Sequence, residues 1–83
     1  MRLSELPAGA NAIVQHVEEA IPSDPIARRL RDIGFVAGEP IKLVAQGPVG
    51  GDPLLVQIGF TRFALRRSEA ARVHLTTASP DAS

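Results

Sequence analysis

The chain of 83 residues contains no cysteine, no tryptophan and no tyrosine, and only 4% of its residues are aromatic. The absence of cysteine excludes disulfides, thiolate metal sites and cysteine nucleophiles. Acidic and basic residues balance to a formal net charge of zero, whereas a dedicated nucleic-acid-binding domain is usually basic. Only the arginines support a role in binding nucleic acid, so we do not expect that role.

Long apolar runs are also missing. No window approaches the roughly 18 consecutive apolar residues that predict a membrane-spanning helix. Pro7 and several polar residues interrupt the N-terminal stretch MRLSELPAGANAIVQHV, so this stretch lacks the apolar region of a signal peptide. We therefore expect a soluble, cytoplasmic protein that does not insert directly into a membrane.

What the sequence does contain is enough apolar material for one small core. Apolar residues make up 45% of the chain, and the length supports a single domain. A domain of this size buries only about 60–65% of the surface that its unfolded chain exposes, so a deep substrate pocket is not expected. No serine–histidine–carboxylate arrangement is visible in the sequence, and we expect no catalytic activity.

Residues 23–34, SDPIARRLRDIG, predict one α-helix. Asp24 is a good N-cap, and Pro25 already has the φ that the first helical position needs. Gly34 can end the helix in a left-handed conformation that would strain a side chain. Apolar residues recur at i, i+4 and i+7 and form one stripe: Ile26, Leu30 and Ile33.

Short alternating segments predict strands. They cover residues 11–19, 40–47, 54–59, 61–67 and 72–76. The first segment has mixed faces, so a β-bulge is possible there. Residues 47–53 are rich in glycine and proline and predict a loop, but the loop lacks the Gly-Lys-Ser/Thr ending of a phosphate-binding loop. The stretch RSEAA predicts a single helical turn capped by Ser68.

Many short strands in so few residues favour a small closed β-barrel, because closure removes exposed sheet edges. We expect a mainly β fold with one α-helix inserted after the first strand and a short helical turn before the last strand. Residues 1–76 are assigned to this domain. Residues 77–83 are small and polar and predict a disordered C-terminal tail.

Four motifs occur in order from Leu3 to about Leu75: LSELPAG, RRLRDIGFVAGEPIKLV, GDPLLVQIG and FALRRSEAARVHL. With them the chain resembles the FeoA family, small cytosolic proteins of bacterial ferrous iron uptake. The resemblance implies an SH3-like barrel and a non-catalytic accessory role. It also implies a partner, the cytoplasmic part of FeoB, which is a membrane iron permease with a GTP-hydrolysing domain. A related module in iron-dependent repressors implies an alternative, a metal-responsive regulatory module that binds a divalent transition metal.

Exposed aromatic residues and arginines dominate the binding energy of interfaces, and they define the candidate docking residues. Phe35 and Val36 lie on the connection after the helix, where a large apolar residue forms either a lid over the core or a contact for a partner. We expect the lid. The alternative for the helix arginines is a solvated face. The candidate partner-binding residues are Arg28, Arg29, Arg31, Phe60 and Arg62.

The nitrogen donors available for a metal ion are His16 and His74. In an SH3-like barrel the first and last strands lie close together, so these imidazoles could meet, with Glu18 and Glu19 near the first of them. Two imidazoles and a carboxylate suit zinc or ferrous iron. No compact ligand motif is present, so no cofactor is required on this interpretation. Two surface histidines, an intermolecular site and a homo-oligomer all remain open.

Overall fold

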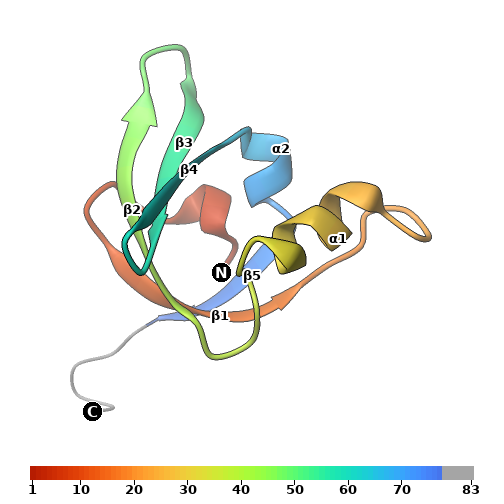
Figure 1. The fold of residues 1–83 in the computed structure, drawn as a ribbon. Helices are drawn as coiled ribbons and strands as arrows, with labels where there is room; N and C mark the ends of the chain where they lie inside the picture. Colours follow the sequence, from red (N-terminus) through yellow and green to blue (C-terminus); the bar gives the residue numbers. More distant parts are fainter. Residues whose placement is uncertain (78–83) are drawn as a thin grey trace.

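The computed structural model describes residues 1–77, which form one antiparallel five-stranded sheet with two short helices (Figure 1). The strand order is β4-β3-β2-β1-β5. In chain order the elements are η1 (Leu3–Glu5), β1 (Asn11–Val17), α1 (Pro25–Asp32), β2 (Pro40–Gly47), β3 (Gly51–Ile58), β4 (Thr61–Leu65), α2 (Arg67–Ala70) and β5 (Val73–Thr77). The predicted helix after the first strand and the predicted helical turn before the last strand are both confirmed.

The sheet is curved but not closed. β4 and β5 are its two edges, and no ladder of backbone hydrogen bonds joins them within residues 1–77. The architecture is the mainly β, SH3-like one that was predicted, but the prediction of full closure was wrong. Figure 1 shows α1 and α2 on the open side of the curved sheet, so helices and side chains complete the enclosure where hydrogen bonds do not.

The domain boundary differs slightly from the prediction. β5 continues to Thr77, one residue beyond the predicted end of the domain, because this residue still pairs with Ala12 of β1. The predicted tail otherwise falls on residues 78–83, which lie outside the described residues. In the part of the chain that the structure describes, no helix is long and apolar enough to span a membrane.

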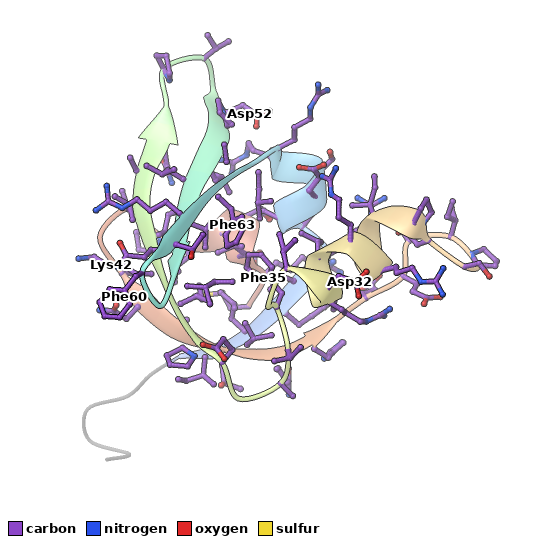
Figure 2. All side chains as sticks on the ribbon, in the orientation of Figure 1. Asp32, Phe35, Lys42, Asp52, Phe60 and Phe63 are labelled. Atoms are coloured by element: carbon purple, nitrogen blue, oxygen red, sulfur yellow. The ribbon has the colours of Figure 1, made fainter. Side chains whose placement is uncertain are left out.

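Phe35 plugs the opening of the sheet. Its side chain has no exposed surface, and its ring centroid lies 6.4 Å from that of Phe63 at an interplanar angle of 55°. Phe35 follows α1 and Phe63 belongs to β4, so their contact joins the helical side of the core to an edge strand (Figure 2). The predicted lid over the core is confirmed for Phe35 but was wrong for Val36, whose side chain is exposed.

The possible bulge in β1 is present. β1 pairs with β5, and the register shifts between Val14 and His16. Val14 is buried before the shift, whereas after it Val17 is buried and His16 is exposed. The bulge therefore reverses the alternation and places the histidine outside the core.

Residues 47–53 are less irregular than predicted. β2 extends to Gly47 and β3 begins at Gly51, so only residues 48–50 lie between the strands. A Cβ atom at Gly47 would lie 2.1 Å from the backbone oxygen of Asp52, so this close approach of two strands requires glycine. In Figure 1 this hairpin projects beyond the rest of the sheet.

The cap of α2 also differs from the prediction. Its N-cap residue is Arg66 rather than Ser68, and the backbone N–H of Arg66 donates to Oε1 of Glu69 at 2.9 Å. The carboxylate of Glu69, the third residue of the helix, thus satisfies the backbone N–H of the N-cap residue.

The start of α1 depends on the carboxylate of Asp24. Oδ1 accepts the N–H of Ile26 and Oδ2 accepts that of Ala20, both at 3.0 Å. Nε of Arg72, which precedes β5, donates to Oδ2 at 2.7 Å, and the Asp24 side chain is 1% exposed. The hydrogen bond from Arg72 is the main reason that the pKa of Asp24 falls from 3.8 to about 2, and the two backbone N–H groups add to it.

This lowered pKa makes a pH-dependent prediction. Asp24 contributes stability that is fully present above about pH 4 and is lost as the pH falls toward about 2. Asp24→Asn should lower stability at pH 7 and reduce the loss on acidification. Urea unfolding followed by circular dichroism across this range measures both effects. Asp32→Asn, on an exposed position of the same helix, is the control, and an equal response of the two variants would contradict the assignment.

Phe35 and Phe60 provide a matched pair for testing the plug. Phe35→Ala empties a fully buried site and should cost about 3–5 kcal/mol of unfolding free energy. Phe60→Ala changes a fully exposed side chain and should stay within about 0.5 kcal/mol of the parent. Chemical denaturation of both variants measures the difference, and similar losses would show that Phe35 does not close the core.

Candidate partner-binding surface and histidine cluster

Phe60 lies at the tip of the β3–β4 hairpin. Ile58 and Thr61 form the last strand pair, and Gly59 and Phe60 form a two-residue turn in which Gly59 has a φ of 59°. The relative exposure of Phe60 is 105%, so its whole ring is in contact with solvent. Figure 2 shows it pointing away from Phe63 and the core. The exposure that the sequence predicted for Phe60 is confirmed, and its contact with a partner stays a prediction.

Arg62 follows on the exposed face of β4. Its Nε donates to Oε1 of Gln57 at 3.1 Å, and Nε2 of the same glutamine donates to the Gly59 carbonyl at 3.0 Å. These two hydrogen bonds hold the guanidinium beside the turn. Phe60 and Arg62 thus form one small surface, which we call the hairpin tip.

The arginines of α1 have different surroundings. Nη2 of Arg29 donates to Glu69 of α2 at 2.8 Å. Nη2 of Arg31 donates to the Val17 carbonyl at 3.0 Å, and its Nη1 lies 3.4 Å from a carboxylate oxygen of Glu19. Both side chains therefore tie α1 to neighbouring elements. Arg28 is exposed and makes no ion pair with any residue from 1 to 77.

The five candidate docking residues do not form one patch. The hairpin tip and α1 lie on different sides of the molecule in Figure 1. Between them the structure has a groove of about 650 Å³, bounded by α1, the end of β4 and α2. The predicted set includes one residue of this groove, Arg29. Neither composition nor periodicity identifies the other residues of the groove, because a groove between separate elements is a property of the tertiary packing. The groove is lined by Ile26, Arg29, Ala64, Arg66, Ser68 and Glu69, together with Pro53.

The two histidines meet as the topology predicted. His16 and His74 are directly opposite each other on β1 and β5, and their rings stack with centroids 4.4 Å apart and an interplanar angle of 7°. Nε2 of His74 lies 2.5 Å from Oε1 of Glu18, and Nη1 of Arg2 lies 3.3 Å from the same oxygen. The hydrogen bond with His74, followed by the charge of Arg2, lowers the pKa of Glu18.

The predicted metal ligands do not converge on one position. The nitrogen lone pairs of an imidazole lie in the plane of its ring, and a metal ion must lie about 2 Å from each nitrogen along them. Parallel rings of His16 and His74 direct their lone pairs along parallel planes, and Glu19 faces Arg31. Within residues 1–77 no group of three or more histidine, aspartate or glutamate side chains is arranged to hold a metal ion.

The stacking leads to a prediction for metal titration. If one ion cannot bind both rings, His16→Ala should leave the affinity for zinc within about threefold of the parent, whereas losing one ligand of a shared site costs far more. Isothermal titration of zinc into the parent, His16→Ala and His74→Ala measures this. A loss of about a hundredfold in both variants would establish a shared site formed by rotation of the rings.

The fold and these surfaces define a small SH3-like domain. A family model described as the FeoA domain matches residues 1–77. The chain belongs to the FeoA family.

Solved structures agree with this assignment. FeoA of Stenotrophomonas maltophilia, whose structure was determined in complex with zinc, is 60% identical with a TM-score of 0.86, over 92% of this chain and 89% of that one. It is described as an SH3 domain protein and a possible ferrous iron transport activating factor. FeoA of Chlorobium tepidum is 37% identical with a TM-score of 0.81, over 95% of this chain and 71% of that one.

Iron(II) transport protein A of Clostridium thermocellum is 32% identical with a TM-score of 0.81. The match covers 94% of this chain but 46% of that protein, so this chain spans less than half of its length. A search of curated protein sequences found no match.

Proposed function

We propose that this chain is a non-catalytic accessory protein of bacterial ferrous iron uptake. It acts from the cytoplasm by binding the cytoplasmic region of a FeoB-type membrane transporter. The observation that carries the proposal is the FeoA domain match over residues 1–77. The relative from Stenotrophomonas maltophilia, described as a possible activating factor for ferrous iron transport, supports the same role.

The hairpin tip supplies a physical basis for binding. A phenylalanine ring that is fully exposed at a tight turn gains roughly 1.5–3 kcal/mol when a partner buries it. Arg62 is fixed beside it by Gln57, so less side-chain freedom is lost on binding. Aromatic residues and arginine are the types that most often carry interface energy.

Binding alone is sufficient for an effect on transport. A protein that binds one conformation of the transporter more tightly than another shifts the population toward the conformation that it prefers. Each tenfold difference in affinity changes the free-energy difference between the two conformations by about 1.4 kcal/mol. No group on this chain needs to react with iron or with a nucleotide.

The direct test is calorimetric titration of this chain into the soluble cytoplasmic domain of FeoB from the same organism. Phe60→Ala should weaken binding by at least about tenfold, as expected for a central aromatic contact. Val49→Ala is the matched control, because Val49 is an exposed apolar residue at the tip of the other long hairpin. Absence of binding by the parent chain would overturn the proposed function. An equal loss of affinity in both variants would show that Phe60 is not a specific contact for FeoB.

A metal-responsive module is the second candidate function. The zinc complex of the Stenotrophomonas maltophilia relative favours it, while the parallel stacking of His16 and His74 opposes a shared site on one chain. The zinc titration described above tests this candidate, and the FeoB titration tests the first.

A further inference from the structure

The two edges of the sheet are not equivalent. The outer edge of β5 is covered by the first residues of the chain, because the N–H of Leu75 donates to the Met1 carbonyl at 2.6 Å and Arg2 forms a bridge with His74. The outer edge of β4 has no such cover among residues 1–77. β4 is therefore the edge strand whose outward N–H and C=O groups have no partner strand within the range that the structure describes.

The register of the β3–β4 hairpin identifies the unpaired groups. Ile58 and Thr61 flank a two-residue turn and form a hydrogen-bonded pair, so hydrogen-bonded and non-bonded pairs alternate from there. Arg62 and Ala64 fall on the non-bonded positions, where N–H and C=O groups point away from β3. Neither residue has another backbone partner in the described part of the chain. Their spacing of two residues is the repeat of a strand.

The surroundings of this edge leave room for another chain. Ala64 is exposed, and its methyl group is too small to shield the backbone. Ala64 and Arg66 form one wall of the groove described above, and Ile26 and Arg29 of α1 form the other. A strand added to β4 would thus lie between β4 and α1, with apolar and polar contacts on its outer side.

The charges along the edge of β4 determine which kind of strand can bind there. Arg62 and Arg66 are both exposed, and neither forms an ion pair with any of the described residues. The carboxylate that lines the groove, that of Glu69, already pairs with Arg29. A cationic edge with no anion of its own favours an acidic strand.

The same arginines disfavour a second copy of this chain. If two β4 strands paired antiparallel about Ala64, Arg62 of one copy would lie opposite Arg66 of the other. Like charges at directly opposed positions destabilise a sheet. Repulsion thus disfavours this register between two copies of the chain, whereas an acidic strand meets no such repulsion.

We propose that β4 is a docking edge that accepts an extended acidic segment of a protein partner as a sixth strand, bonded to the backbone of Arg62 and Ala64. The inference depends on the proposed function only in that the partner is a protein. The docking edge shares Arg62 with the hairpin tip, but it depends on the backbone of β4 and not on the ring of Phe60. Phe60→Ala therefore tests the hairpin tip, and the amide exchange of Arg62 and Ala64 tests the edge.

The test uses an eight-residue peptide of alternating valine and glutamate, with a valine–lysine peptide of equal length as the control. Binding is followed by NMR on the full chain. At saturation the amides of Arg62 and Ala64 should exchange at least about fivefold more slowly, since each gains a hydrogen bond. The lysine peptide should produce no slowing.

Two substitutions separate backbone pairing from side-chain contact. Ala64→Pro removes the outward N–H at an edge position where proline is tolerated, and should weaken binding of the acidic peptide by about tenfold. Ala64→Val keeps the N–H and should remain within about threefold. Circular dichroism verifies that both variants are folded, and the exchange measurement on the parent chain does not depend on either variant.

Three results would overturn the inference. Unchanged exchange at Arg62 and Ala64 with saturating acidic peptide would exclude strand addition. Equal protection by both peptides would exclude selection by charge. Protection that appears when the protein concentration alone is raised would identify a second copy as the occupant. None of these results depends on FeoB, so a failure of the FeoB titration remains a separate finding about the proposed function.

Discussion

The position of α1, and of the groove beside it, depends on one buried carboxylate. Asp24 begins α1, holds the connection from β1 through the N–H of Ala20, and pairs with Arg72 at the start of β5. An eight-residue helix is too short to be stable alone, so its place is fixed by contacts such as these. A buried charge is costly unless all of its hydrogen bonds are made, and here both oxygens are satisfied. The groove beside β4 exists because this anchor holds α1 opposite the sheet.

The way in which the sheet is enclosed links its architecture to binding. A barrel closed by hydrogen bonds has no free edge, whereas this sheet is completed by Phe35, by the helices and by the N-terminal residues over β5. Closure by side chains excludes water from the core but does not satisfy the backbone of β4. The fold therefore carries an edge that is stable in water and still able to pair. The arginines on that edge limit which molecules can use it.

Local features of the fold were predictable from sequence, and features that join distant segments were less so. The signals at Asp24 and Gly34 act within one or two turns, and they gave the helix its correct limits. The meeting of His16 and His74 followed from topology, but the parallel stacking of their rings depends on the register of β1 against β5. Closure was predicted wrongly because alternation identifies the buried face of a strand and not its neighbours. The groove was missed for the same reason, since it is bounded by three elements from different parts of the chain.

The pairing of β1 with β5 also has a consequence for biosynthesis. β2 pairs only with the first part of β1, through residues 11–13, and the remainder finds its strand partner in Val73–Thr77. During translation β1 leaves the ribosome early, and its partner strand β5 follows only after nearly the whole domain has been synthesised. Contacts between such distant segments form slowly and leave strand edges exposed in the meantime. The second half of β1 therefore keeps an unpaired edge until residues 73–77 have been synthesised.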